Sequence, residues 1–401
     1  MKSDPNLDNF RIDAYNSHDE YEIQVDTGGF GCFVYDSLRT LHKSGLFTIV
    51  RNPFYRDIQG LFGNYKTPIY HEITAEGFEF LGGASGFRKE AFQDNLFLTE
   101  QERYIEIPRK RIAIAGIGAV GNAHLMTLVE QGIEQINISE GDRYNYKNIQ
   151  RQRGADVSTV GRLKSEVMAE HALLKNPYCN IRLFDNIGRK TPSRSSFTDL
   201  ETKTLDAFLQ DVDLAIDGID FYEIDARRDF INAACEKGIP VISAGPVGFG
   251  TSYVVFMPEG PNFDKYFNVQ EGMHEEWKLL YFLAGIAPKR LHKEYTNNPK
   301  MIFDVLVRRM PPSISGAVQL CAGVTALNAV KILFNKGKVK AVPYNHQFDA
   351  RTNKWHCGKS WTGGNYNPLV RRTLEKISWT AHVDELRKFH EEHPGEPLRV
   401  Y

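Results

Sequence analysis

Between residues 111 and 244, short apolar runs alternate with longer stretches in which apolar residues recur every three or four positions. The short runs have the pattern of buried strands, and the stretches between them have the spacing of helices. Five strands are predicted, at Ile112–Ala115, Gln135–Ser139, Asn180–Phe184, Asp213–Asp217 and Pro240–Ala244. Strands that alternate with helices of this length predict an α/β fold with a doubly wound, mostly parallel sheet.

Outside this block the pattern is less regular, and it divides the chain into four predicted parts. Residues 1–85 mix short apolar runs with Gly-rich turns, which predicts a small α+β domain. Residues 86–257 form the α/β domain, and the polar stretch 86–104 is predicted to connect the two domains. Residues 258–312 are rich in Pro, Lys, Phe and Tyr, which predicts an insertion of loops and short helices. Residues 313–401 are predicted to complete the α/β domain, beginning with a long apolar helix.

The composition is that of an ordinary globular protein. Apolar residues make up 42% and charged residues 25% of the chain, and its formal net charge is −1. The chain as a whole therefore has no excess of positive charge that would attract nucleic acid or an acidic membrane. The N-terminus has no apolar core of signal-peptide length and no stretch approaches a membrane span, which predicts a cytoplasmic protein. The five cysteines form no C-x-x-C pair, so neither a disulfide framework nor a zinc site is expected.

A glycine-rich turn, GIGAVG, follows the first predicted strand and opens a helix. Gly116 permits the tight turn, Gly118 lets the backbone approach a phosphate, and Gly121 lets the helix pack on the strand. The N-terminus of that helix supplies amide donors and a partial positive charge for an anion. A βα turn without a ligand is the alternative. The strand and helix around the motif favour a Rossmann-like nucleotide site.

Charged and amide side chains follow the second predicted strand. Glu140 lies 140 − 121 = 19 residues after Gly121, with Asp142 close behind, where such folds hold a ribose. Lys164 opens the next helix, and a triphosphate needs cations of this kind, whereas a nicotinamide needs neutral or apolar surroundings. ATP is therefore the predicted nucleotide, and a solvated basic loop is the alternative. The amide and guanidinium side chains between these residues are Asn148, Arg151, Gln152, Arg153 and Arg162.

Two further carboxylates, Asp217 and Asp220, lie at the carboxyl end of a later predicted strand. Ligands of open parallel sheets bind at that end. A carboxylate there can hold the Mg²⁺ that accompanies ATP, because Mg²⁺ prefers oxygen ligands and one or two carboxylates. Alternatively, Asp220 caps the helix that follows.

Taken together, the motifs resemble the ThiF/MoeB superfamily, which includes the ubiquitin-activating enzymes, in a branch without zinc. The resemblance covers about residues 98–257 and the helix at 316–333. It rests on GIGAVGN, Glu140, Asp142, NIQRQ at 148–152, GRLK at 161–164, Asn176–Pro177 and DGID at 217–220. It implies ATP-dependent adenylation of a carboxylate, usually at the terminus of a peptide or protein, by a homodimer.

The resemblance also implies roles for the matching residues. The glycines would line the ATP phosphates, Glu140 would bind the ribose, and Asp220 would hold magnesium. The predicted catalytic residues are Arg151, Lys164 and Asp220. The predicted nucleotide-binding residues are Gly116, Gly118, Gly121, Glu140, Asp142, Asn148, Gln152 and Asp217.

The chain departs from the family pattern at several positions. Glu140 stands where the family usually has Asp, and Phe221 where it usually has Asn. The segment before the first strand often sends an arginine into the partner subunit's site. Here Asp94 lies near that position, and Arg88 is the candidate substitute. The family's C-x-x-C pairs for zinc are absent. Cys235 and Cys321 lie within predicted apolar helices, which favours buried structural thiols, so no thioester step is expected.

Three carboxylate substrates fit this chemistry. The first is a ribosomally made precursor peptide in antibiotic biosynthesis, which would be dehydrated or cyclised; residues 1–85 would then clamp its leader segment. The system that modifies the pantocin A precursor is a named example of this branch. The second is the C-terminus of a ubiquitin-like or sulfur-carrier protein. The third is a tRNA-bound carboxylate, which the near-neutral net charge does not favour. A non-catalytic nucleotide-binding module is the alternative from another class.

Overall fold

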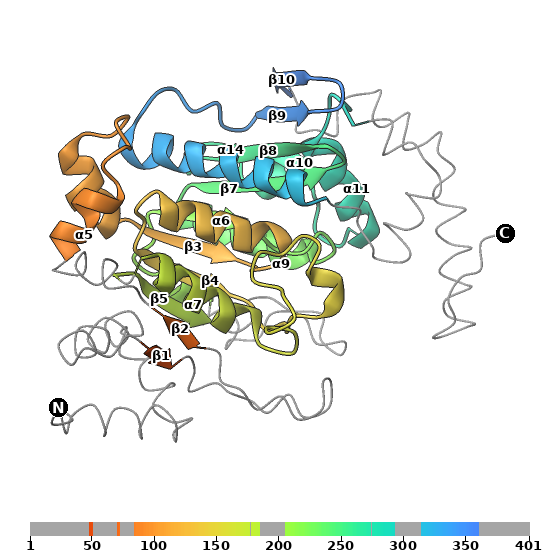
Figure 1. Cartoon of the computed structure of the whole chain (residues 1–401). Coiled ribbons are helices and arrows are strands. Elements are labelled where there is room, and N and C mark those ends of the chain that lie inside the picture. The colour runs from red at the N-terminus through yellow and green to blue at the C-terminus, as the bar shows by residue number, and fades with distance from the viewer. Residues whose placement is uncertain are drawn as a thin grey trace, which may run out of the picture. The chain divides into compact units, whose positions relative to one another are not determined.

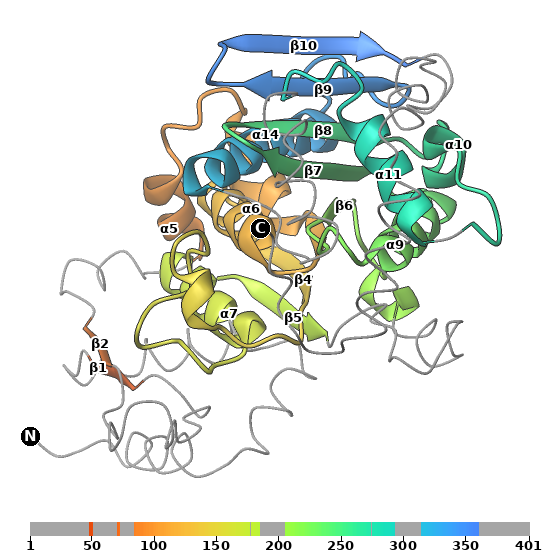
Figure 2. The ribbon, with the colours of Figure 1, turned by 90° about the vertical axis from the view of Figure 1, so that its right-hand side faces the viewer.

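A computed structural model describes residues 48–50, 70–72, 84–176, 178–184, 205–273, 275–292 and 314–360 (Figure 1). Eight of its strands form one sheet: β3 (Arg111–Ala115), β4 (Gln135–Ser139), β5 (Asn180–Phe184), β6 (Leu214–Asp217), β7 (Val241–Val247), β8 (Gly250–Phe256), β9 (Tyr344–Asp349) and β10 (Lys354–Lys359). Their order across the sheet is β10-β9-β8-β7-β6-β3-β4-β5, which can be followed in Figures 1 and 2 together. The two short strands β1 (Thr48–Val50) and β2 (Tyr70–Glu72) pair with each other in antiparallel fashion.

The strand pairing confirms the predicted α/β fold with a Rossmann-like, mostly parallel sheet. β3 lies parallel to both β4 and β6, and β4 lies parallel to β5. All five predicted strands are present as β3 to β7, within a few residues of the predicted bounds. The α-helices among the described residues include α5 (Ala84–Ala91), α6 (Ala119–Glu130), α7 (Lys164–Lys175), α9 (Ile224–Glu236), α10 (Phe263–Phe267), α11 (Glu275–Ile286) and α14 (Ser315–Phe334).

The sequence from Tyr344 onward is aromatic and strand-like, but the antiparallel extension of the sheet that it helps to form is not predicted. β9 pairs in antiparallel fashion with β8 and with β10. The apolar run GTSYVVF, which forms β8, follows β7 after only two residues, Gly248 and Phe249, and Gly248 has a positive φ of 56°. A glycine in this conformation between two apolar runs is a hairpin signal, and it predicts β8 when both runs are read together.

The chain divides into two compact units. The first contains the described residues up to Asp220, together with Ile239–Ile242 and Ala322–Val339. The second contains Phe221–Gly238, Ser243–Cys321 and the described residues from Lys340 onward. The four-part division drawn from the sequence stays a prediction. Apart from β1 and β2, the proposed N-terminal clamp lies outside the described residues, as does all that follows residue 360.

Apolar strands form the core of the first unit. Every residue of β3 is buried, and Ile112, Ile114, Ile136 and Ile138 have no exposed surface. Strands that are covered on both faces have near-continuous apolar sequences of this kind. Helices α6 and α7 pack against each other, α6 against β3 and α7 against β5 (Figure 1). The carboxyl ends of β3 and β4 are thereby held in register, since Ala115 pairs with Ser139.

The stretch 86–104, which is predicted to connect the two domains, is itself helical over much of its length. Part of α5 lies in it, and it is followed by a π-helix at Glu102–Glu106 and a 3₁₀ turn at Ile107–Arg109. Leu98 and Ile107 are buried in the core of the molecule. Their apolar neighbours Leu96, Phe97 and Ile105 are exposed, so the sequence pattern does not reveal which side chains of this stretch are buried.

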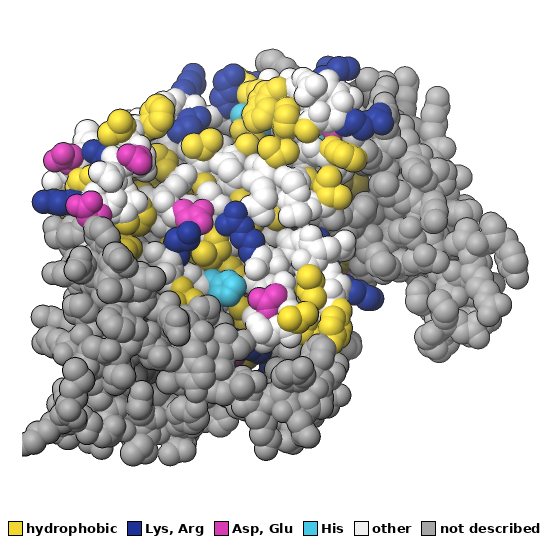
Figure 3. Space-filling model, in the orientation of Figure 1, with side chains coloured by type: hydrophobic (Ala, Val, Ile, Leu, Met, Phe, Trp, Pro, Cys, Tyr) yellow, Lys and Arg dark blue, Asp and Glu magenta, His cyan; other side chains and the backbone are white. Residues whose placement is uncertain are grey.

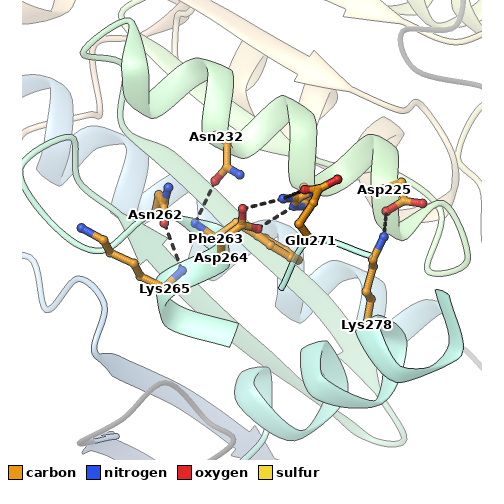
Figure 4. Close-up of polar contacts among 9 residues, drawn as sticks. Asp225, Asn232, Asn262, Phe263, Asp264, Lys265, Glu271 and Lys278 are labelled. Atoms are coloured by element: carbon orange, nitrogen blue, oxygen red, sulfur yellow. Dashed lines mark hydrogen bonds and ion pairs between the residues drawn. The ribbon is translucent and has the colours of Figure 1, made fainter. Parts of the chain in front are cut away.

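The second unit contains the two helices of the predicted insertion, α10 and α11, packed against α9 (Figure 4). Its apolar centre is aromatic: the Phe267 ring lies 4.6 Å from that of Phe263 and 5.1 Å from that of Phe282, measured between centroids. Aromatic contacts of this kind add to the burial of apolar surface. The predicted short helices of residues 258–312 are thus confirmed for the part that the structure describes.

Helix α14 corrects the expectation that no stretch approaches a membrane span. It has 20 residues and a mean hydropathy of 1.6 over its most apolar window, so it could cross a membrane by length and composition alone. The same is true of many core helices in globular proteins. In this molecule 44% of that window is buried, including Ala317, Val318, Cys321 and Ala322.

Candidate functional site

The glycine-rich turn after β3 lies directly against the turn after β6. Gly116 has a φ of +86°, and its N–H donates to the Ser139 carbonyl at 2.9 Å. A Cβ on Gly116 would lie 2.4 Å from the carbonyl oxygen of Gly218, and a Cβ on Gly121 would lie 1.9 Å from that of Gly116. The fold itself therefore requires glycine at 116 and 121, because any side chain would collide with backbone.

Gly118 differs from these two glycines. A Cβ at this position would meet no atom within 4 Å, and its φ of −73° is open to any residue. Gly118 is also the N-cap residue of α6, where it provides no side-chain hydrogen bond. The first-turn amides of an uncapped helix are donors for an anion. Packing does not explain this glycine, whereas close approach of a phosphate would.

The predicted ribose acids and Lys164 come together beside this turn. The Glu140 carboxylate accepts the Ile117 N–H at 3.2 Å through Oε2 and the Asp142 N–H at 2.9 Å through Oε1. The Lys164 ammonium lies 3.3 Å from Asp142 Oδ2 and 3.9 Å from Glu140 Oε2. Glu140 thus joins the end of β4 to the glycine turn, and each of its oxygens retains a second lone pair for a hydroxyl donor.

Lys164 is the most unusual group of this cluster, because it is a cation with only 6% of its surface exposed. It is the first residue of α7, and its own N–H donates to the Asp142 carbonyl at 2.9 Å. A buried ammonium is stable only beside counter-charges, and Asp142 and Glu140 supply them. Lys164 is therefore held in place both by its backbone N–H and by its side-chain ammonium.

The amide and guanidinium side chains in and near the loop from 145 to 155 differ in the contacts that they make within the protein. Asn148 Oδ1 accepts the Asn145 N–H at 2.9 Å in a capping box, so this amide shapes the loop. The Arg162 guanidinium donates to Glu170 at 2.5 Å and is part of a structural ion pair. Arg151 is half-buried and donates to the Lys147 carbonyl at 3.2 Å. Gln152 is buried, and its Oε1 has no hydrogen-bond partner among the described residues.

Asn122 directly follows the GIGAVG turn, and no role is predicted for it from the sequence. It lies in the first turns of α6, has no exposed surface, and its Oδ1 accepts the Arg153 N–H at 3.2 Å. This hydrogen bond ties the loop that carries Arg151 and Gln152 to the helix that the glycine turn opens. A buried amide immediately after GxGxxG is the sequence signal that could have identified it.

Replacing Asn122 with alanine is expected to destabilise the protein and to raise the Michaelis constant for ATP more than it lowers the turnover number. The change removes the side-chain acceptor of a part-buried hydrogen bond from the Arg153 N–H, which costs about 1 kcal/mol. Urea unfolding and steady-state kinetics would measure the two effects. Asn122→Asp keeps the acceptor oxygen but buries a carboxylate, so it should lose stability while keeping kinetic constants closer to those of the parent than Asn122→Ala does. Unchanged kinetics in Asn122→Ala would contradict a positioning role.

Asp217 and Asp220 differ in exposure. Asp217 ends β6, is buried, and its Oδ1 accepts the Ile219 N–H at 3.1 Å. Asp220 is exposed, and the N-cap residue of α9 is Glu223, so Asp220 is not the cap of that helix. Among the described residues, no group of three or more His, Cys, Asp or Glu side chains could hold a metal ion. An exposed carboxylate still fits Mg²⁺, which takes one or two carboxylates plus substrate phosphates and water.

Arg88 has a partner within its own chain. Its Nε and Nη2 donate to the two Glu134 carboxylate oxygens at 2.7 and 2.5 Å. Burial raises the pKa of Glu134, and the Arg88 guanidinium opposes that rise. Breaking such a pair leaves a buried charge uncompensated. This pairing speaks against Arg88 as the arginine that reaches into a partner's site.

Charges of both signs are interspersed on the face shown in Figure 3, around α6 and α7. This mixture agrees with the net charge of −1 for the whole chain. The candidate site therefore concentrates charge locally, in Lys164 and its two carboxylates, rather than through a broad field.

Residues 92–361, about two thirds of the 401-residue chain, match the ThiF family, and the chain belongs to that family. It is 32% identical over 137 residues to a tRNA threonylcarbamoyladenosine dehydratase of Haemophilus influenzae, covering 34% of this chain and 48% of the relative. It is 25% identical over 186 residues to the molybdopterin-synthase adenylyltransferase of Escherichia coli, covering 46% and 60%. A probable adenylyltransferase/sulfurtransferase MoeZ of Mycobacterium tuberculosis is 29% identical over 153 residues, covering 38% and 35%. The matches therefore span less than two thirds of these relatives' own length.

Two solved structures are similar to this chain at a low level. One is a complex of E. coli MccB with MccA, at a TM-score of 0.45 and 16% identity, covering 71% of this chain and 70% of that chain. The other is PaaA, at a TM-score of 0.45 and 16% identity, covering 89% and 87%. Similarity at this level carries no inference about activity.

Proposed function

We propose that this ThiF-family protein is an ATP-dependent adenylyltransferase that activates a carboxylate. The observation that carries the proposal is the buried Lys164 ammonium, held between Glu140 and Asp142 at the end of β4. Gly118, the uncapped start of α6, adds amide donors for phosphate. Two of the relatives named above are themselves adenylyltransferases by name.

Adenylation requires the protein mainly to position the two reactants and to neutralise the negative charge of the phosphates. A carboxylate oxygen of the substrate attacks the α-phosphorus of ATP, the bond to the β-phosphate oxygen breaks, and pyrophosphate leaves with that electron pair. The product is a mixed anhydride of the carboxylate and AMP. No protein nucleophile is needed, so the rate depends on aligned reactants and on cations near the departing charge. Arg151 and Lys164 would supply those cations.

Each part of the nucleotide has candidate partners in the chain. The α6 N-terminus at Gly118 would face the phosphates, and Glu140 would accept hydrogen bonds from the ribose hydroxyls through its remaining lone pairs. Asp142 holds Lys164 before ATP arrives, so the triphosphate would compete with a carboxylate for the same ammonium. Mg²⁺, when bound with ATP, supplies charge neutralisation, and the exposed Asp220 carboxylate would hold it.

The proposed substrate is a ribosomally made precursor peptide whose activated carboxylate is then attacked internally, with loss of water. The sequence supports this substrate through the 85 residues that precede the adenylation domain and through the absence of C-x-x-C pairs. The C-terminus of a ubiquitin-like or sulfur-carrier protein is the second candidate, favoured by the relatives named as molybdopterin-synthase adenylyltransferase and MoeZ. We also propose a homodimer and a cytoplasmic location.

The mass of a candidate precursor peptide after incubation with the protein, ATP and Mg²⁺ tests this assignment. We expect loss of one water from the peptide, and no loss when ATP is omitted. A lasting AMP adduct or a thioester on a small carrier protein, with the peptide unchanged, would contradict the peptide assignment and favour the carrier protein. Binding of ATP without turnover of either substrate would favour a non-catalytic nucleotide-binding module.

A further inference from the structure

A second site candidate lies in the insertion, in a pocket of about 480 Å³. Six residues line it: Gln270, Glu271, Gly272, Met273, Trp277 and Tyr281. All belong to the second unit, and they lie on α11 or in the loop before it. None of them has a role in the nucleotide chemistry described above.

The wall of this pocket is anchored on both sides to α9 (Figure 4). Before the loop, the Arg228 guanidinium makes two hydrogen bonds to the Asp264 carboxylate on α10, at 2.7 and 2.8 Å. After the loop, Lys278 on α11 donates to Asp225 at 2.6 Å. Bidentate and charge-assisted contacts of this kind hold a fixed geometry. The pocket is therefore formed before any ligand arrives.

Two aromatic rings form one side of the pocket. Trp277 and Tyr281 are four residues apart on α11, which places them on one face of the helix. Their ring centroids are 6.3 Å apart at an interplanar angle of 68°. Trp277 remains 39% exposed, although aromatic side chains of this size are mostly buried. Exposed aromatic faces of this kind attract cations.

Glu271 is the charged residue among those that line the pocket. Its side chain is 92% exposed. Glu271 Oε2 lies 3.4 Å from Arg228 Nη2, which binds Asp264 more closely, at 2.8 Å. A carboxylate beside two aromatic rings suits an organic cation. An anion would be repelled, an apolar ligand would desolvate the carboxylate without compensation, and a metal ion would need more oxygen ligands.

We propose that this pocket binds a cationic side chain, arginine or lysine, of the peptide substrate. Glu271 would pair with the charge, and Trp277 and Tyr281 would contact its face and its apolar stem. The identity of the occupant as part of the substrate rests on the proposed function; the affinity of the pocket for a cation does not. Recognition of a basic residue away from the reacting carboxylate would select one peptide among many.

The test uses the full chain labelled with 5-fluorotryptophan, in which the fluorine resonance of Trp277 is assigned through Trp277→Phe. We expect Nα-acetyl-arginine amide, added up to about 10 mM, to shift that resonance in a saturable manner. The citrulline analogue, which has the same shape without the charge, should shift it little. In Glu271→Gln the affinity for the arginine probe should fall roughly three- to tenfold, whereas the control Glu259→Gln should match the parent.

Equal shifts with arginine and citrulline, or no shift at all, would overturn the proposal. The dispersion of the four fluorotryptophan resonances reports in the same spectrum that Glu271→Gln remains folded. Nucleotide turnover is measured on the same samples. Arginine binding without any adenylation would contradict the proposed function but support the cation pocket. Adenylation without arginine binding would support the proposed function and contradict the cation pocket.

Discussion

Replacing Lys164 with methionine is expected to reduce pyrophosphate exchange into ATP by at least about a hundredfold. The change removes the buried ammonium, and removal of a group aimed at developing charge typically costs two to three powers of ten. Methionine keeps an unbranched apolar stem in the same space, so packing around Glu140 and Asp142 is disturbed little. Radioactive exchange between pyrophosphate and ATP measures the effect.

Lys175→Met is the matched control for this change. Lys175 lies on the same helix, and its ion pair with Glu130, at 3.4 Å, is between side chains that are 50% and 41% exposed. Exposed pairs contribute little, so exchange and stability should stay near the parent values. If Lys164→Met exchanges pyrophosphate within about twofold of the parent rate, under conditions where the parent is active, then Lys164 takes no part in the reaction.

Replacing Gly118 with alanine is expected to weaken ATP binding by roughly tenfold or more while leaving the stability of the protein almost unchanged. A Cβ at Gly118 meets no atom of the protein within 4 Å, so the fold accepts it. The added methyl would stand where a phosphate must approach the first-turn amides of α6. Isothermal titration with ATP and thermal unfolding of the same variant separate the two quantities.

Two other glycines serve as controls for this prediction. Gly245→Ala adds a methyl that also meets no atom within 4 Å, far from the turn in sequence, and should change neither quantity. Gly121→Ala should unfold or strongly destabilise the protein, since its Cβ would lie 1.9 Å from the Gly116 carbonyl oxygen. If Gly118→Ala binds ATP as tightly as Gly245→Ala, the glycine turn does not face a phosphate.

The convergence of Glu140, Asp142 and Lys164 could be predicted from the sequence because it follows from local rules. Glu140 directly follows β4, which is adjacent to β3 in the sheet, and Lys164 begins the next helix. In doubly wound sheets both positions lie at the carboxyl edge, so residue spacing along the chain fixes spacing in space. The strand and helix bounds were predictable for the same reason.

Other features depend on contacts between residues far apart in sequence, and no pattern predicts them. Arg88 pairs with Glu134 across 46 positions, and Asn122 binds the Arg153 amide across 31. Nothing in the local sequence distinguishes Asn148, whose side chain accepts the Asn145 N–H within the loop, from Arg151 three positions later. The pocket at Trp277 arises only because α10 and α11 are both tied to α9.

The Gly118 and Lys164 predictions concern different parts of one site. The first concerns the amides that face a phosphate, and the second concerns the cation near the charge that leaves. Loss of binding in Gly118→Ala with loss of turnover in Lys164→Met would assign the two functions separately. Two losses of the same kind would indicate that Lys164 contributes mainly to affinity.

The most direct test of the central claim is the exchange of labelled pyrophosphate into ATP by the full chain with Mg²⁺, measured with a precursor peptide, a carrier protein ending in a free carboxylate, and a tRNA-bound carboxylate in turn. The account predicts exchange that depends on one of the carboxylate substrates, is strongest with the peptide and is lost in Lys164→Met. Absence of exchange with all three, and no difference in ATP turnover between the parent and Lys164→Met, would contradict it.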